Sequence, residues 1–204
     1  MSAKSNVYSQ GGGGTHYEFE VQTAFFICFL LGVDIPGMIN GQIIEFRQQA
    51  GSLGYETDDL LLKCEDEIGM HRFLFQIKHN LTISVKSDLF KEVLIAAWKD
   101  FKNRELFDPS SDRIYLIKSA LTVDEKNDLR QLLSWARVKE DPVDFVNEVS
   151  RIKAKKSYYE LFKSVLDGIE GPVSQEDMHK FFRCFNILEY DFGDQISVAR
   201  SNKF

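Results

Sequence analysis

The apolar positions along the chain first predict one helix and three strands. Residues 19–31 are hydrophobic nearly all round, which is typical of a helix buried in a core. Thr15 and Glu18 precede them at the spacing of a capping box, so we expect a helix over residues 15–31 that ends at Gly32. Strand-like runs follow at residues 42–48, 59–64 and 72–78, and the last two are apolar on both faces, as in strands covered by helices.

The rest of the chain predicts a long helix, one more strand and a helical end. Apolar side chains recur at the helical period over residues 86–104, and residues 112–119 predict a fourth strand. After Thr122 the pattern is helical, with helices expected over residues 123–137, 142–153, 157–169 and 175–185. The order αβββαβ plus a helical extension predicts an α/β fold with a central mixed sheet flanked by helices.

This pattern divides the chain into three parts. Residues 1–14 are expected to be a flexible tail, because their four consecutive glycines lack the strand and the lysine of a phosphate-binding loop. Residues 15–120 form the predicted core, and residues 121–204 a helical extension of the same domain. The polar end at residues 198–204 predicts a fragment of a longer protein.

A lysine closes the third strand-like run, although lysine is among the residues least often buried. Alternate side chains of a strand share a face, so Gln76 and Lys78 lie side by side, opposite Phe75. The link formed by residues 65–71 has hairpin length, and a hairpin places the start of one strand beside the end of the other. Asp59 is therefore expected next to Gln76 and Lys78.

An acid, an amide oxygen and an ammonium at one sheet edge suit phosphodiester hydrolysis. Carboxylate and amide oxygens are hard ligands that Mg²⁺ prefers, and Mn²⁺ can take its place. The cation polarises the phosphate and makes a nearby water more acidic. A lysine orients the attacking water and offsets the developing negative charge.

These motifs resemble the PD-(D/E)xK restriction-endonuclease-like fold, in its Mrr-like branch. An acid before one strand and (Asp/Glu/Gln)-x-Lys at the end of the next match, with Gln76 in place of the second acid, while the usual proline before the first acid is absent. Residues 17–20, "YEFE", are similar to the helix whose glutamate assists the metal site. Further stretches resemble the N-terminal double-stranded-DNA endonuclease domain of bacterial anti-phage effectors, namely CBASS endonucleases and STAND-NTPase phage sensors: "GGTHYEFEVQTAFF", "ETDDLLL", "FLFQIKHNLTIS", "AWKDF" and "DRIYLIKSAL".

The resemblance implies a role for each residue. Asp59 would be the main metal ligand, Gln76 would add a carbonyl oxygen, Lys78 would be the catalytic lysine, and Glu20 would complete the metal site. Asp58 is the alternative to its neighbour as a ligand. The implied activity is Mg²⁺-dependent cleavage of double-stranded DNA with low sequence specificity, in an anti-phage effector. Cleavage of both strands implies a homo-oligomer, a dimer or tetramer, activated through a linked sensor or NTPase domain beyond this chain.

Each of these residues also has a purely structural explanation. The two aspartates suit a turn, Glu20 suits the first turn of a helix, and Lys78 can extend its ammonium from a strand end into water. A nuclease-fold module that binds DNA or protein without cutting, and a nuclease acting on RNA, both remain alternatives. Glu45 is a further candidate for the site, whereas His71 and His79 are expected to be structural or to contact phosphate.

Composition limits the partners and the compartment. A net charge of −6 argues against a uniformly basic nucleic-acid-binding surface, so DNA contact needs local clusters. Three widely spaced cysteines, Cys28, Cys64 and Cys184, predict free thiols in a cytoplasmic protein. The N-terminus has no signal-peptide pattern and no apolar run is long enough for a bilayer, so no membrane partner is expected. The candidate basic residues are Lys86, Lys91, Lys99, Lys102, Arg104, Arg151, Lys153, Lys155 and Lys156.

Overall fold

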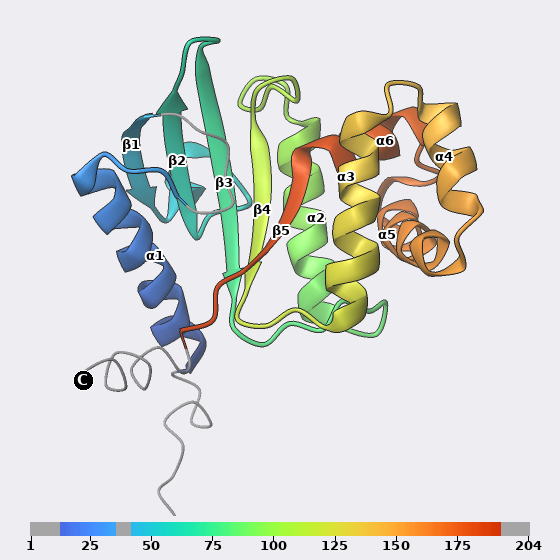
Figure 1. Cartoon of the computed structure of the whole chain (residues 1–204), viewed down its shortest axis with the longest axis horizontal. Helices are drawn as coiled ribbons and strands as arrows, with labels where there is room; N and C mark the ends of the chain where they lie inside the picture. The colour runs from blue at the N-terminus through green and yellow to red at the C-terminus, as the bar shows by residue number, and fades with distance from the viewer. Residues whose placement is uncertain (1–12, 36–41, 193–204) are drawn as a thin grey trace, which may run out of the picture.

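A five-stranded mixed sheet with strand order β1-β2-β3-β4-β5 forms the centre of the molecule (Figure 1). The computed structural model describes residues 13–35 and 42–192. β1 pairs antiparallel with β2 and β2 with β3, whereas β4 and β5 continue the sheet in parallel to β3. The strands are β1 (Gln42–Gln48), β2 (Leu60–Glu65), β3 (Met70–Lys78), β4 (Arg113–Lys118) and β5 (Phe185–Glu189).

Helices cover both faces of this sheet (Figure 1). One helix, α1 (Gly13–Leu31), packs on one face, and the remaining helices form a layer on the other. The second layer contains α2 (Asp88–Lys102), α3 (Arg130–Val138), α4 (Pro142–Ser150), α5 (Lys153–Glu170) and α6 (Gln175–Cys184). A 3₁₀ helix (Ala50–Leu53) precedes β2, and a π-helical segment (Glu125–Leu129) leads into α3.

The two faces of β3 contribute to two separate hydrophobic cores. Leu74 packs with α2 and the helices that follow it, while Phe73, Phe75 and Ile77 pack against α1. Side chains of this strand therefore alternate between the layers, as its sequence predicted. That alternation puts Gln76 on the face of Leu74, at the end of the strand.

The predicted order αβββαβ is present from α1 to β4, and β1 has the predicted bounds. The expectation of a purely helical part after residue 121 is wrong, because β5 joins the sheet beside β4. This strand follows α6 without a loop, and only Phe185 and Ile187 of its residues are buried. Its short apolar run looks like the end of the preceding helix in sequence, and only tertiary pairing makes it a strand.

Two expectations for α1 are also corrected. The helix begins at Gly13, so Thr15 is not its N-cap, and Glu18 accepts a side-chain hydrogen bond from Gln22 instead of closing a capping box. The helix is not buried all round either, since Leu30 is 66% exposed. Most of the predicted tail and the polar end fall in residues 1–12 and 193–204, outside the described residues.

The three cysteines are free thiols, with Cys64 and Cys184 buried. This agrees with the prediction of unpaired cysteines. Burial raises the pKa of the Cys64 thiol to about 12 and that of Cys184 to about 11, so both stay protonated near neutral pH. Within the described ranges, no helix has the length and apolar character that a membrane span requires.

Candidate functional site

The hairpin of β2 and β3 brings the predicted acid and the Gln-Ile-Lys tripeptide together. They meet at the edge of the sheet where β2 begins and β3 ends, which is the edge meant below. Leu60 pairs with Phe75 in this antiparallel hairpin, so the residue before β2 lies beside the end of β3. Asp59 Oδ2 is 2.7 Å from Gln76 Nε2 and 3.0 Å from Lys78 Nζ. The structure thus places three of the predicted site residues in direct contact.

A single oxygen of Asp59 collects all of these contacts. The backbone N–H of Ile77 also donates to Oδ2, over 2.6 Å, so three donors fix the carboxylate in one orientation. Within the described part of the chain no donor contacts Oδ1. The side chains of Asp59 and Lys78 are 12% and 24% exposed, so the cluster is largely screened from water but still reachable.

The first helix presents Glu18, and not Glu20, to this edge. Residues two apart on a helix point in directions about 200° apart, so the two glutamates face opposite sides. Buried Gln22 donates its Nε2 to Glu18 Oε1 and to the backbone oxygen of Asp59, each over 2.9 Å. Glu20 Oε1 instead lies 3.3 Å from His16 Nδ1. The expectation that Glu20 completes the site is therefore corrected: the helix contributes Glu18.

The acids at this edge repel one another. Burial raises the pKa of the Glu18 carboxyl, and the charge of Asp59 raises it further, while Lys78 acts in the opposite direction. The pKa of Asp58 is also raised, first by burial and then by the charge of Asp59. Neighbouring carboxylates resist full ionisation unless a positive charge compensates them. The edge therefore carries three neighbouring carboxyl groups, of Glu18, Asp58 and Asp59, whose charge the ammonium of Lys78 offsets only in part.

The two neighbouring aspartates have different surroundings. Asp59 contacts the end of β3, whereas Asp58 faces a hollow of about 410 Å³ that Glu18 and Asp59 also line. Gly51 forms part of the wall, and a Cβ there would lie 3.2 Å from Asp58 Oδ2. Asp59 is therefore the aspartate that contacts Gln76, and Asp58 lines the neighbouring hollow.

A buried acid of α2 holds the segment that carries both aspartates. Asp100 is 2% exposed, and its two oxygens accept the backbone N–H groups of Glu56 at 2.9 Å and Thr57 at 2.7 Å. Burial raises the pKa of this carboxyl, and the two hydrogen bonds lower it. Because Thr57 directly precedes Asp58, these bonds fix where the chain enters β2.

We predict that Asp100→Ala lowers the free energy of unfolding by about 1–3 kcal/mol, because it leaves two N–H groups without an acceptor. Urea denaturation of the variant and the wild type measures this difference. The matched control is Asp88→Ala on the same helix, since that side chain is 86% exposed. Equal losses in the two variants would contradict the assigned role of Asp100.

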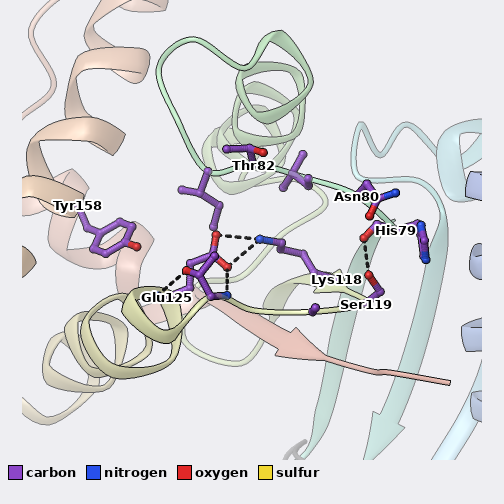
Figure 2. Close-up of a pocket in the computed structure, with 11 residues that line it drawn as sticks. His79, Asn80, Thr82, Lys118, Ser119, Glu125 and Tyr158 are labelled. Carbon is purple, nitrogen blue, oxygen red and sulfur yellow. Dashed lines mark hydrogen bonds and ion pairs between the residues drawn. The ribbon is translucent and has the colours of Figure 1, made fainter. Parts of the chain in front are cut away.

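A second hollow, of about 320 Å³, opens where β3 and β4 end (Figure 2). A third hollow, of about 370 Å³, is lined by Glu18 and Lys78, and it adjoins this one because His79 and Asn80 line both. In its wall Lys118 Nζ lies 2.8 Å from each carboxylate oxygen of Glu125, and both side chains are buried (Figure 2). Because the pair neutralises itself, this hollow is polar without an excess of positive charge.

The candidate basic residues differ in their surroundings. Lys155 is buried and lies 3.0 Å from Asp128, so the expectation that it contacts DNA is wrong. Lys86 is exposed and lies just before α2, whereas Lys91, in the first turns of that helix, lies 2.8 Å from Asp88. Lys153 and Lys156 are exposed as well. Several of the others are engaged by nearby groups: Lys99 with Glu56, Lys102 with Glu170 and Asp177, Arg104 with the Phe101 ring, and Arg151 with Glu148.

The remaining candidates are held by other partners. Glu45 Oε2 lies 2.6 Å from Lys63 Nζ, which lowers the pKa of the glutamate. His71 Nε2 lies 2.9 Å from Asp66 Oδ1 at the hairpin end of β3, away from the site. The ring of His79 lies 5.1 Å from that of Tyr17, centroid to centroid, beside the site. Of the three candidates, only His79 lies at the edge that carries Asp59.

The oxygen atoms at this edge are of the kind that coordinate a hard divalent cation such as Mg²⁺ or Mn²⁺. Asp59 and Glu18 offer carboxylate oxygens, and Gln76 keeps its amide oxygen as an acceptor because its Nε2 donates to Asp59. Among the described residues no group of three or more His, Cys, Asp or Glu side chains is already arranged to hold a metal ion. The candidate ligands are two carboxylates and one amide, so this edge offers fewer acidic ligands than a site built from carboxylates alone.

Comparison with known proteins finds no matching family model and no matching curated protein. Two solved structures of the Acinetobacter baumannii Cap4 SAVED/CARF-domain containing receptor are similar, the second with the cyclic trinucleotide 2'3'3'-cAAA. Each is 12% identical over 98% of this chain, with TM-scores of 0.41 and 0.39. The chain spans 37% and 36% of those receptors, and at such TM-scores the likeness carries no conclusion about function.

Sequence reasoning missed Glu18, Gln22 and Asp100. Glu18 and Gln22 lie four residues apart, and Phe25 follows at the next helical position, so all three share one face of α1. A polar pair on the face that carries a buried phenylalanine was the available signal. Asp100 had a similar signal, because it lies between the buried Ala97 and Phe101 on the apolar face of α2.

Proposed function

We propose that this chain is a metal-dependent endonuclease domain that hydrolyses phosphodiester bonds of double-stranded DNA. The observation that carries the proposal is the contact of Asp59 Oδ2 with both Gln76 and Lys78, where β2 begins and β3 ends. The element order αβββαβ supports it, since the resemblance to the PD-(D/E)xK fold requires this order. The acid presented by α1 also supports it, with Glu18 in the role first assigned to Glu20.

In this proposal Asp59, Gln76 and Glu18 hold the cation. A bound Mg²⁺ or Mn²⁺ supplies positive charge that stabilises the attacked phosphate and acidifies a neighbouring water. Asp58, at the rim of the same hollow, is the secondary candidate ligand. Gln22 acts as a positioning residue, because its amide group joins Glu18 to the backbone oxygen of Asp59.

The chemistry assigned to Lys78 follows from its position. Its ammonium, held by Asp59, orients a water molecule toward the phosphorus and offsets the negative charge that develops on the phosphate. The water oxygen forms a bond to phosphorus, the bond to the leaving sugar oxygen breaks, and that oxygen takes up a proton. Each cut consumes one water and leaves one phosphate end and one hydroxyl end.

The biological context rests on the sequence resemblance. We propose a low-specificity effector domain of a cytoplasmic anti-phage defence protein, linked covalently to a sensor or NTPase region outside this chain. Oligomerisation activates it, because one site cuts one strand and a duplex break needs two. Lys86, exposed in the segment between Lys78 and α2, is the leading candidate for contact with the DNA backbone.

A binding and cleavage experiment on one labelled sequence tests this proposal. The same sequence is offered as duplex DNA, single-stranded DNA and RNA, with Mg²⁺, Mn²⁺ or EDTA, and both band shifts and products are recorded. The proposal expects products from duplex DNA only with a divalent cation. Metal-dependent binding of the duplex without products would instead indicate a non-catalytic module, and preferential loss of the RNA would indicate an RNA-directed nuclease.

The correction of the helix residue gives a matched pair of variants. Glu18→Gln is expected to lower cleavage by at least about 10–100-fold, the cost of losing an outer-shell partner, because it removes a carboxylate that would itself hold the cation. Glu20→Gln, two residues away on the opposite side of α1, is expected to leave cleavage unchanged. Initial rates across a Mn²⁺ titration measure the difference, and a loss confined to Glu20→Gln would contradict the assignment of Glu18.

A further inference from the structure

One side of α1 is apolar and faces solvent. Its residues recur at helical spacing and form a continuous stripe, which we call the α1 outer face. Fractional exposure is 56% at Phe19, 42% at Phe26 and 66% at Leu30, values that are large for aromatic and aliphatic side chains. The α1 outer face comprises Phe19, Thr23, Phe26, Ile27, Leu30 and Leu31.

The charge of this helix restricts what can cover the face. The α1 outer face has no charged residue, and α1 has no lysine or arginine along its whole length. Contact with a nucleic-acid backbone or an anionic membrane surface requires such cations. The occupant is therefore an apolar protein surface.

The size of the face matches one half of a protein interface. Its apolar side chains expose on the order of 500 Å², at the upper end of the largest patch on a typical monomer. A standard interface buries roughly 800 Å² on each partner, so the face and a modest rim around it suffice for a stable contact. Single exposed apolar residues are normal on a protein surface, whereas a contiguous apolar patch of this size is typical of an interaction site.

The same face carries both projecting side chains and a hollow. A hollow of about 300 Å³ lies between α1 and the edge strand β1, and it is lined by Phe26 and Phe46 together with Gln22, Thr23 and Gln48. The Phe26 and Phe46 rings pack edge to face with centroids 5.2 Å apart, so the two rings support each other in one wall of the hollow. A surface with both features can pair with a rotated copy of itself, as in the isologous interfaces of symmetric dimers.

We propose that the α1 outer face is the contact between two copies of this chain. In the dimer, apolar side chains such as Leu30 of one copy enter the hollow beside Phe26 of the other. Self-association through this face needs neither DNA nor a metal ion. It would supply the oligomerisation assumed in the proposed function, and because its test uses neither ligand, the two proposals can fail separately.

The test is the molar mass in solution, measured by sedimentation velocity over a wide concentration series. The wild type is expected to shift from the monomer mass of 23.5 kDa to twice that value. Leu30→Glu is expected to weaken the dimer at least about tenfold, because it places a charge in an apolar contact. Ile27→Glu is a second variant at an exposed position, 50% exposed, so neither change removes a core contact.

Val143→Glu on α4 is the control, since this valine is 57% exposed and lies outside the face. It should dimerise like the wild type, and thermal melts of all variants should coincide. A wild type that stays monomeric throughout would overturn the proposal and indicate another protein segment as the occupant. Dimers of equal strength in both α1 variants would overturn it as well.

Discussion

Lys78→Met is expected to lower metal-dependent cleavage of duplex DNA about 10²–10³-fold, the cost of removing one donor aimed at developing charge. Methionine keeps most of the aliphatic stem, so the packing at the end of β3 changes little, while the ammonium that contacts Asp59 is lost. The affinity for DNA should change much less than the rate, because one surface-accessible cation is only a small part of backbone binding. Single-turnover cleavage and a parallel filter-binding assay separate the two quantities.

The matched control for this variant is Lys63→Met. Lys63 lies on the neighbouring strand β2 and is 29% exposed, close to the 24% of Lys78, and it too is ion-paired to a carboxylate. It is expected to cleave like the wild type. If the two variants lost activity to the same extent, a general effect of removing a strand lysine would explain the loss, and the role of Lys78 would be contradicted.

Asp59→Asn is expected to weaken Mn²⁺ binding at least about 100-fold and to remove cleavage with it. Loss of an outer-shell partner alone typically costs 10–100-fold in metal affinity, and Asp59 is the proposed ligand itself. Asparagine keeps an oxygen that can accept the Ile77 N–H, so the hairpin should fold as before. Isothermal titration with Mn²⁺, together with a urea denaturation curve, measures both expectations.

Asp66→Asn is the control for the second variant. Asp66 lies at the other end of the same hairpin and accepts backbone N–H groups of Ile68 and Gly69. Like Asp59, it is a carboxylate that accepts backbone N–H groups of the hairpin, but it lies outside the proposed metal site. Equal Mn²⁺ affinity in the wild type and Asp59→Asn would contradict the proposed metal site, whatever the effect on activity.

The core of the site was predictable because hairpin geometry follows from local sequence. The alternation along β3 put Gln76 and Lys78 on one face, and the short link to β2 put Asp59 beside them. Both features depend on period and loop length, which a single sequence contains. The sequence could not decide between the adjacent Asp58 and Asp59, because a shift of one residue in strand register exchanges their positions. The contacts of Asp59 with Gln76 and Lys78 in the structure distinguish the two.

The contribution of α1 was harder to predict. Which of two acids on a helix meets a sheet depends on how the helix is rotated about its axis, and tertiary packing sets that rotation. An all-apolar helix gives little information about its buried side, so the exposure of Leu30 could not be read from the pattern. The ion pair of the buried Lys155 could not be predicted either, because its partner Asp128 lies 27 residues away in sequence.

The measurement that tests the central claim most directly is cleavage of supercoiled plasmid by the wild type and Lys78→Met. Both proteins carry a C-terminal dimerising coiled coil, so that weak self-association cannot mask activity, and each is assayed with Mg²⁺, Mn²⁺ or EDTA. The account predicts nicked and then linear plasmid with either cation, none with EDTA, and almost none with the variant. Intact plasmid with the dimerised wild type in both cations would contradict the claim that this edge of the sheet is a nuclease site.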